Sequence, residues 1–290
     1  MAVGDALGAP VEFDPPEQIA GLREELFAFP GGGGWDPGEF TDDTQMSILL
    51  AQHLANGQFD GNKLATSWAV WAIHTSTKDV GIQTSLVLSE VARGQHWSVA
   101  VSGLPAAAAG NGSLMRVAPV ALFQLAHSCD ITDLARAQSR ITHPNAWCQE
   151  ACVAFSTALR YMLLSGKQPE MEYVQASTPN SDVRDRIARA WSDDQPQADG
   201  FVLDTLTVGL WAARTADNFD EVVWSAVSRG EDADTSAAVA GALARVHNSV
   251  RVGASGISHG DKSTFNSSQP MFAEVDRTYV ESVAEKLATL

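Results

Sequence analysis

Basic residues are scarce in this chain. It has 19 lysines and arginines against 35 aspartates and glutamates, which gives a formal net charge of −16 over 290 residues. The sequence pI is near 4.7. Proteins that bind nucleic acid neutralise phosphates with clustered Lys and Arg, so this charge balance argues against nucleic acid as a partner. An anionic ligand would need metal ions or backbone amides to hold it.

Cysteines are few, and long apolar runs are absent. The odd number of cysteines, Cys129, Cys148 and Cys152, without metal-ligand spacing, favours a reduced, cytoplasmic setting over a disulfide framework. Cys148 and Cys152 are one helical turn apart, and we expect both to be small core hydrophobes. No apolar run reaches the roughly 20 residues of a membrane span, and no basic stretch leads into an apolar segment near the start. We expect a cytoplasmic protein without a membrane partner, with a monomer as the default state.

Strand signals are also scarce, because few segments alternate Val, Ile or Thr with polar residues between turns. Apolar residues instead recur at three- and four-residue steps, which predicts helices. The steps relate Met46, Leu49, Leu50 and Leu54, then Leu64, Trp68, Trp71 and Ala72; further runs cover 118–126, 148–164, 203–213 and 219–228. Loops are predicted at 30–34, 103–112 and 165–200. With 45% hydrophobic residues and no clear linker, we predict one compact all-α domain over residues 1–290.

Two short clusters of acids and threonine stand far apart, and each opens an apolar helical run. They are Thr41-Asp42-Asp43-Thr44 and Asp232-Ala233-Asp234-Thr235. Carboxylate and hydroxyl oxygens are hard ligands that suit magnesium or manganese better than zinc or copper. Either cluster alone is explained as well by helix capping, since Asp and Thr are preferred N-caps. The two together favour a divalent-metal site.

Near the start, the segment GDALGAPVE contains two glycines before Pro10. Glycine permits tight turns and proline directs the preceding backbone away from helix, so we expect a turn that points Glu12 into a cleft. Asp5 is expected to form hydrogen bonds within that turn.

Three further motifs each precede a helical run. The segment 110–116, GNGSLMR, has the composition of an anion-binding turn whose amides enter a helix. His143, in Thr-His-Pro, and Asp79, in Lys-Asp-Val-Gly, stand at predicted helix starts. Single His and Asp residues at such positions are more often caps than catalysts, so these two motifs are weak signals by themselves.

Taken in order, six strings resemble the ADP-ribosylglycohydrolase family, whose bacterial type is the dinitrogenase reductase-activating glycohydrolase. The strings are GDALGAPVEF, FTDDTQM, KDVG, GNGSLMRVAP, THPNAWCQEAC and GEDADTSAAVAGALA, and they span approximately 2–244. The resemblance implies an all-α fold with a binuclear magnesium or manganese centre. It also implies a hydrolase that removes ADP-ribose from protein side chains, through an arginine or serine linkage, or from a small molecule.

The resemblance also assigns site residues, by their match to the family's motifs. Two metal ions would be held by Thr41, Asp42, Asp43, Asp232, Asp234 and Thr235. The catalytic set would comprise Glu12 beside the metals and ribose, Asp79 near the bond to be cleaved, and the ligands Asp42 and Asp43. Asn111, Gly112 and Ser113 would follow the diphosphate, with His143 at the ligand's edge. Glu12 and Asp79 are the candidates for proton transfer, and the sequence does not choose between them.

Three departures from the family pattern stand out. The chain begins almost at the GDALG motif, where relatives usually have a preceding helical turn, so part of the first helix is expected to be missing. Glu231 stands where many members have glycine. Residues 245–253 depart from the expected small-residue pattern, which leaves that edge of the pocket without a prediction.

Three alternatives remain open at this point. The acceptor could be a small molecule, because the motifs hold only the ADP-ribose half of a substrate. The chain could be a non-catalytic ADP-ribose-binding or immunity-type protein, although retention of all six candidate ligands weighs against this. An unrelated magnesium-dependent diphosphatase also fits oxygen ligands beside a phosphate loop.

Overall fold

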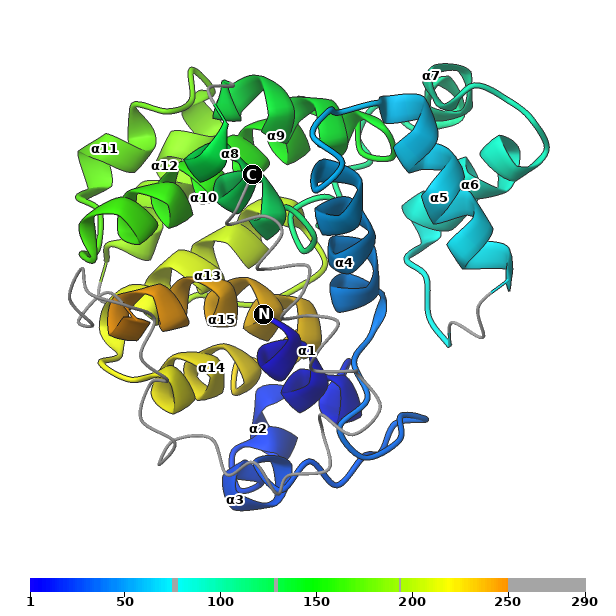
Figure 1. Ribbon diagram of the computed structural model, residues 1–290. Coiled ribbons are helices and arrows are strands. Elements are labelled where there is room, and N and C mark those ends of the chain that lie inside the picture. The colour runs from blue at the N-terminus through cyan, green and yellow to red at the C-terminus, as the bar shows by residue number, and fades with distance from the viewer. Residues whose placement is uncertain (75–77, 128–129, 193, 250–290) are drawn as a thin grey trace.

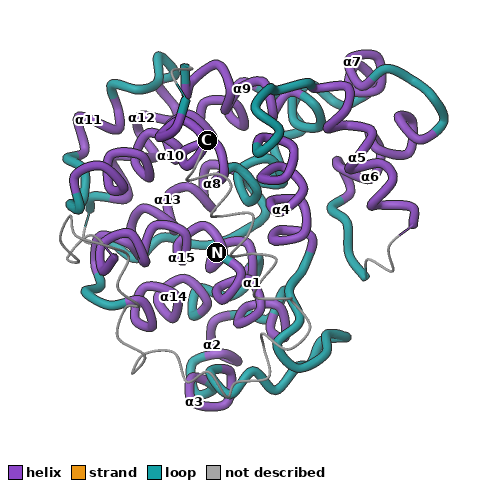
Figure 2. The backbone as a smooth tube through the Cα atoms, viewed as in Figure 1, coloured by secondary structure: helices purple, strands orange, loops and turns teal. Residues whose placement is uncertain are grey.

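The computed structural model describes residues 1–74, 78–127, 130–192 and 194–249. Within those ranges the chain is helical, and its β structure is limited to two isolated bridges, Gly32 with Trp35 and Gly110 with Phe201. Figure 2 shows this composition along the backbone, where purple helices alternate with teal loops. The all-α prediction is confirmed.

The helices follow in chain order. They are α1 (Ala2–Gly8), α2 (Pro16–Ile19), α3 (Arg23–Leu26), α4 (Asp42–Leu54), α5 (Gly61–His74), α6 (Ile82–Ala92), α7 (Trp97–Ala100), α8 (Ala118–Ala126), α9 (Ile131–Arg140), α10 (Ala146–Ser165), α11 (Met171–Gln175), α12 (Ser181–Ala190), α13 (Val202–Thr215), α14 (Phe219–Val227) and α15 (Ala233–Ser249). Two short 3-10 helices, η1 (Ala9–Val11) and η2 (Val101–Gly103), complete the set. The predicted helical runs coincide with α4, α5, α8, α10, α13 and α14.

Helix α15 occupies the centre of this arrangement, as its small residues predict. It packs against α1, α13, α14 and α10. Figure 1 shows it in orange between α13 and α14, with α1 beside its N-terminal half. Small side chains make such close packing possible. A Cβ added at Gly209 of α13, for example, would lie 2.5 Å from Cγ1 of Val239 in α15. The second acid cluster therefore sits at the start of a helix that is held on several sides.

The first motif forms a helix, so the predicted turn is wrong. Gly4 and Gly8 lie within α1, where they allow α1 to approach α15. A Cβ at Gly4 would stand 2.1 Å from the carbonyl oxygen of Ala237, and one at Gly8 would stand 2.5 Å from Cα of Asp234. These glycines are therefore explained by close helix packing, and the left-handed backbone conformation that glycine also permits is not required at either position.

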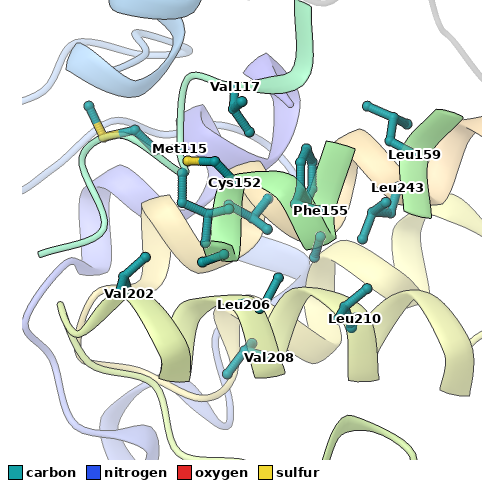
Figure 3. Packing of buried hydrophobic residues seen from close by; sticks show 14 of the residues in the cluster. Met115, Val117, Cys152, Phe155, Leu159, Val202, Leu206, Val208, Leu210 and Leu243 are labelled. Atoms are coloured by element: carbon teal, nitrogen blue, oxygen red, sulfur yellow. The ribbon is translucent and has the colours of Figure 1, made fainter. Parts of the chain in front are cut away.

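Helix α10 packs against α13. Figure 3 shows Phe155 and Leu159 of α10 above Leu206 and Leu210 of α13. Cys152 lies in the same layer, and Cys148 and Cys152 are both free and fully buried, which confirms that they are core residues. Cys129 lies outside the described residues. This rigid layer supports the loop that carries the 110–116 motif.

The polar stretch 165–200 contains α11 and α12, so the loop prediction is wrong there. Helix α12 begins after Asn180, whose side chain accepts hydrogen bonds from the backbone N–H groups of Asp182 and Val183. It buries Val183, Ile187 and Ala190 along one face. An N-cap followed by apolar residues at helical spacing was present in the sequence, but the many charged residues between them concealed it.

Helices α5 and α6 pack against each other, and α5 also packs on α4. The indole of Trp68 in α5 donates a hydrogen bond to the backbone oxygen of Met46 in α4, at 3.2 Å. The loop that carries Asp79 is held at the beginning of α4 by the backbone N–H of Gly81, which donates to Asp42 Oδ2 at 3.3 Å. None of the helices in the described ranges combines the length and apolar character that crossing a membrane requires.

Candidate metal and ligand site

The first acid cluster forms the first turn of α4. Thr41 is the N-cap, and its Oγ1 accepts a hydrogen bond from the backbone N–H of Asp43 at 3.3 Å. Capping is thus part of the explanation for Thr41. The side chains of Asp42 and Asp43 are not needed for this cap. Asp42 instead accepts a hydrogen bond at Oδ2 from the backbone N–H of Gly81, at 3.3 Å. Both are buried, with 6% and 1% of Asp42 and Asp43 exposed.

Asp5 in α1 holds this turn in place, and the predicted role within its own turn is wrong. Its carboxylate accepts hydrogen bonds from the backbone N–H groups of Thr41 and Thr44, at 2.9 and 3.0 Å, and from the Thr44 hydroxyl at 2.5 Å. Asp5 is fully buried. A carboxylate at these free amides also interacts favourably with the positive end of the α4 dipole.

The second acid cluster meets the first at the start of α15. The Thr235 hydroxyl donates to Asp43 Oδ1 at 3.3 Å, and the amide of Asn111 donates to Asp232 Oδ2 at 2.5 Å. One oxygen each from Glu12, Asp232 and Asp234 lies within 4.8 Å of the others, a grouping that could hold a metal ion. The structure therefore brings together residues separated by about two hundred positions in the chain.

Two strained residues fix the loops that carry Glu12 and Asp232. Phe13 and Glu231 both have left-handed backbones, with φ of 68° and 51°. The N–H of Phe13 donates to the carbonyl of Glu231 at 2.7 Å, and the N–H of Glu231 donates to the carbonyl of Asp14 at 2.8 Å. Left-handed conformations at non-glycine residues cost free energy and persist only where surrounding contacts impose them. Here the two loops impose them on each other and so keep Glu12 near the second cluster.

Burial and mutual repulsion keep these carboxyl groups protonated more readily than usual. Burial, then the charges of Asp79 and Asp232, raise the pKa of Glu12 to about 8. Burial and then Asp79 raise the pKa of Asp42 to about 7. The pKa values of Asp43 and Asp234 are raised well above the usual range, first by burial and then by neighbouring carboxylates. Closely spaced buried acids without a compensating cation give this result.

The donor set fits a divalent cation. Asp43 Oδ2 and Asp234 Oδ1 are buried and have no hydrogen-bond partner within the described part of the chain. Buried polar oxygens normally have a partner, so two orphaned carboxylate oxygens in one acidic cluster indicate a missing positive group. All the candidate donors are hard oxygens, which suits magnesium or manganese. The acidic cluster is therefore a candidate metal site.

The 110–113 loop lies beside the second cluster through the bond from Asn111 to Asp232. The Asn111 amide also donates to Thr205 Oγ1 at 2.9 Å, and its backbone N–H donates to the carbonyl of Gly200 at 3.2 Å. The ring of His143 lies against Gly112, where an added Cβ would be 2.8 Å from Cε1 of the ring. The loop is therefore packed closely against this ring.

The Ser113 side chain turns into the core. Its Oγ is buried and accepts hydrogen bonds from the Ser139 hydroxyl at 2.9 Å and from Cys152 Sγ at 3.5 Å. Only its backbone remains as a candidate ligand contact. Asp79, by contrast, is half-buried, and its charge acts on both Glu12 and Asp42.

The sequence did not reveal the roles of two residues that organise the site. Asp5 supports the first acid cluster across 36 positions of sequence. Arg116, at the end of the 110–116 motif, is fully buried behind the loop. An aspartate inside an apolar helix and an arginine between apolar residues were the available signals, because charged residues are rarely buried without a specific partner.

Comparison with known proteins decides the family. Residues 1–259 match the family described as ADP-ribosylglycohydrolase. The chain belongs to the ADP-ribosylglycohydrolase family. It is 32% identical over 251 residues to ADP-ribosyl-[dinitrogen reductase] glycohydrolase of Rhodospirillum rubrum, with coverage of 84% of this chain and 81% of that protein. It is 33% identical over 260 residues to ADP-ribosylarginine hydrolase Tri1 of Pseudomonas putida strain GB-1, covering 84% and 67%.

A solved structure agrees with this assignment. A chain titled "ADP-ribosylglycohydrolase-related protein complex" superposes with a TM-score of 0.75 at 29% identity, covering 99% of this chain and 94% of that one. The predicted family is thereby confirmed. As an ADP-ribosylglycohydrolase, the protein is a hydrolase of glycosidic bonds.

Proposed function

We propose that this ADP-ribosylglycohydrolase removes ADP-ribose from arginine side chains of modified proteins, with two divalent cations, magnesium or manganese, at the acidic cluster. The names of the Rhodospirillum and Pseudomonas relatives support an ADP-ribosylated protein and an arginine linkage. The observation that carries the metal proposal is the pair of orphaned buried oxygens, Asp43 Oδ2 and Asp234 Oδ1.

The ligands proposed are side-chain oxygens from both clusters. They are Thr41, Asp42, Asp43, Asp232, Asp234 and Thr235, all of which are at most 9% exposed. When bound, the cations would orient the ribose hydroxyls and increase the acidity of a water molecule at the site. Asp5 and Asn111 hold the two halves of this ligand set in position through their hydrogen bonds.

Two further carboxylates are proposed to act on the reacting sugar. Breaking the bond at ribose C1 develops positive charge on the ring, which the carboxylates of Glu12 and Asp79 would stabilise. The pKa of about 8 for Glu12 in the metal-free protein reflects its burial among acids. Bound cations would lower this pKa, so the choice of Glu12 rests on its position: one carboxylate oxygen lies within 4.8 Å of oxygens of Asp232 and Asp234, which makes Glu12 our candidate for proton transfer.

The ADP-ribose diphosphate is proposed to lie along 110–113. The proposed donors are the backbone N–H groups of Gly112 and Ser113, since that of Asn111 donates to the Gly200 carbonyl and the Ser113 hydroxyl is turned into the core. An acidic protein repels a diphosphate, so amide donors and bound cations together resolve that conflict. His143 would contact the edge of the ligand.

The test is hydrolysis of a defined substrate. Peptides with arginine-linked and serine-linked ADP-ribose are incubated with the protein and magnesium, manganese or chelator, and products are identified by mass spectrometry. We expect intact ADP-ribose from the arginine-linked peptide only when metal is present. Asp234→Asn should reduce the rate by several orders of magnitude, whereas Asp217→Asn, a matched change at an exposed position, should not change it.

Other products would contradict the proposal in different ways. Release from the serine-linked peptide alone would assign a different linkage. AMP as product would indicate a diphosphatase. Metal and ADP-ribose binding without turnover of either peptide would indicate a small-molecule substrate or a non-catalytic binder, and equal rates with metal and chelator would exclude the metal site.

A further inference from the structure

Arg116 is a fully buried cation surrounded by neutral partners. Its Nε donates to Oε1 of Gln138 at 3.0 Å, and its Nη2 donates to the Gln138 carbonyl at 3.1 Å and to the Thr142 hydroxyl at 2.9 Å. The guanidinium stacks on the Trp68 ring, 3.9 Å from its centroid. No carboxylate within the described ranges forms an ion pair with it. Burying such a charge is costly, so packing alone is a poor explanation for it.

Thr142 connects this cation to His143. The Thr142 Oγ1 accepts from Arg116 and lies 2.8 Å from Nδ1 of His143. A hydroxyl has one hydrogen to donate, and Nδ1 is its only acceptor among the contacts that the described residues make. Pairing that hydrogen within the structure requires Thr142 to donate to Nδ1. In a neutral imidazole whose Nδ1 accepts, the ring proton is on Nε2.

The protein also keeps this ring neutral. Burial, followed by the nearby positive charge of Arg116, lowers the pKa of His143 well below its ordinary value. Both causes disfavour the imidazolium. A neutral ring is also what pairing the Thr142 hydroxyl hydrogen with Nδ1 requires.

The Nε2 edge of His143 faces the proposed diphosphate loop. An added Cβ would be 3.0 Å from Nε2 at Gly112 and 3.6 Å from it at Gly110. His143 is only 2% exposed, yet its Nε2 forms no hydrogen bond with another residue in the described part of the chain. Nε2 is not one of the fully buried atoms without a partner, so it remains in contact with solvent beside the anion-binding turn. A ring nitrogen placed in this way is available to a ligand.

We propose that Arg116 and Thr142 are positioning residues that fix neutral His143 with its proton on Nε2, so that His143 donates a hydrogen bond to the ADP-ribose diphosphate. The inference rests on the proposed function for the identity of the ligand. The opposite tautomer would direct a lone pair at the phosphate oxygens and repel them. Arg116 thus controls which hydrogen-bonding face the histidine presents, without touching the ligand.

Gln138 connects Arg116 to the 110–113 loop. Its Oε1 accepts from Arg116, which orients its amide so that Nε2 donates to the Ser113 carbonyl at 3.1 Å. An amide whose oxygen is fixed has its nitrogen fixed too. Arg116 therefore helps to fix both the position of the loop, through Gln138, and the tautomer of the histidine that packs on it, through Thr142.

The first test needs no substrate. The full chain is labelled with ¹⁵N at histidine, the His143 signals are assigned by their loss in His143→Gln, and long-range ¹H–¹⁵N spectra are recorded at pH 7 without ligand. We expect protonated Nε2 and unprotonated, hydrogen-bonded Nδ1. A proton on Nδ1, or a charged ring, would overturn the proposal. Because no turnover is involved, this result is independent of whether the proposed function is correct.

The second test measures ADP-ribose affinity by calorimetry with metal present. Thr142→Val removes the hydroxyl, and we expect about tenfold to a hundredfold weaker binding, the range for a hydrogen bond to a charged group. Thr142→Ser keeps the hydroxyl and should restore affinity to within about threefold. Thr66→Val, at an exposed threonine of α5, controls for the general effect of the change.

The outcomes separate cleanly. Equal affinity of folded Thr142→Val and Thr142→Ser would refute the positioning role. Failure of the native protein to bind ADP-ribose would refute the proposed function, while the tautomer measurement would still decide the hydrogen-bond arrangement. If Thr142→Val does not fold, the native tautomer and the Thr142→Ser affinity decide the question.

Discussion

Asp5 and Thr44 are joined twice across the boundary between α1 and α4: one carboxylate oxygen accepts from both the backbone N–H and the hydroxyl of Thr44. The other oxygen accepts from the backbone of Thr41. The N-terminal helix therefore sets the position of the first acid cluster through a single side chain. We therefore expect stability and metal binding to be coupled at this residue.

Replacing Asp5 should affect both properties. Asp5→Asn puts an NH₂ group where one oxygen accepts an N–H, so we expect a loss of about 2 kcal/mol or more in the free energy of unfolding and weaker metal binding. Asp60→Asn is the matched control, because Asp60 accepts from the backbone N–H groups of Asn62 and Lys63 through Oδ1 alone, and Asn caps equally well. The ion pair that Asp60 Oδ2 forms with Lys63 Nζ, at 3.8 Å, is exposed and contributes little. Chemical denaturation and metal titration of both variants test this. Equal effects at the two positions would contradict it.

Replacing Glu231 with glycine should stabilise the protein. Its φ of 51° is unfavourable for any side chain, and the family pattern noted above has glycine there. We expect Glu231→Gly to raise the free energy of unfolding by up to about 1 kcal/mol with activity retained. Glu231→Gln removes the charge but keeps the strain, so it should show no such gain. A comparable gain in both variants would assign the effect to charge.

Gly8 should not tolerate a methyl group. Gly8→Ala would place Cβ 2.5 Å from Cα of Asp234, so α1 and α15 must separate and the metal ligands with them. We expect a loss of about 1–3 kcal/mol in the free energy of unfolding, together with weaker metal binding. Gly21→Ala is the control, since nothing lies within 4 Å of a Cβ there. Thermal unfolding with and without metal distinguishes the two, and an unaffected Gly8→Ala would show that the helices can separate freely.

The metal-free protein should lose stability as pH rises. The carboxyl pKa values of Asp42 and Glu12 are raised from 3.8 and 4.5 to about 7 and about 8. Between the ordinary and the raised pKa values, the folded state binds more protons than the unfolded chain, so the free energy of unfolding falls as pH rises. The contribution of these two groups to that free energy is largest below about pH 4.

Thermal unfolding in chelator from pH 5 to pH 8 measures this dependence. Added magnesium or manganese should raise the melting temperature most at pH 8, where the ligands are ionised. Asp42→Asn cannot ionise, so it should stabilise the metal-free protein at pH 8 and reduce the effect of metal. A melting temperature that rises with pH in chelator would contradict this account of the acidic cluster.

Much of the fold followed from local pattern. The regular apolar spacing from Met46 to Leu54 predicts α4, and the small residues after Thr235 predict a closely packed central helix. Helix α12 escaped prediction because its buried face consists of only three residues among many charges. This segment forms a helix because of its N-cap and of packing against residues distant in sequence, and a local sequence pattern gives little information about such packing.

The candidate site, too, could be predicted only in part from the sequence. The sequence by itself determined which oxygen-bearing residues are present, and their motifs indicate the family and the hard-cation chemistry of the cluster. It could not show that Asp5 supports α4, that Gly8 serves helix packing, or that the Ser113 hydroxyl faces the core. Those relationships join segments far apart in the chain, so only the tertiary structure decided them: a side chain's hydrogen-bond partners and burial depend on which helices pack together, and that is a property of the whole fold.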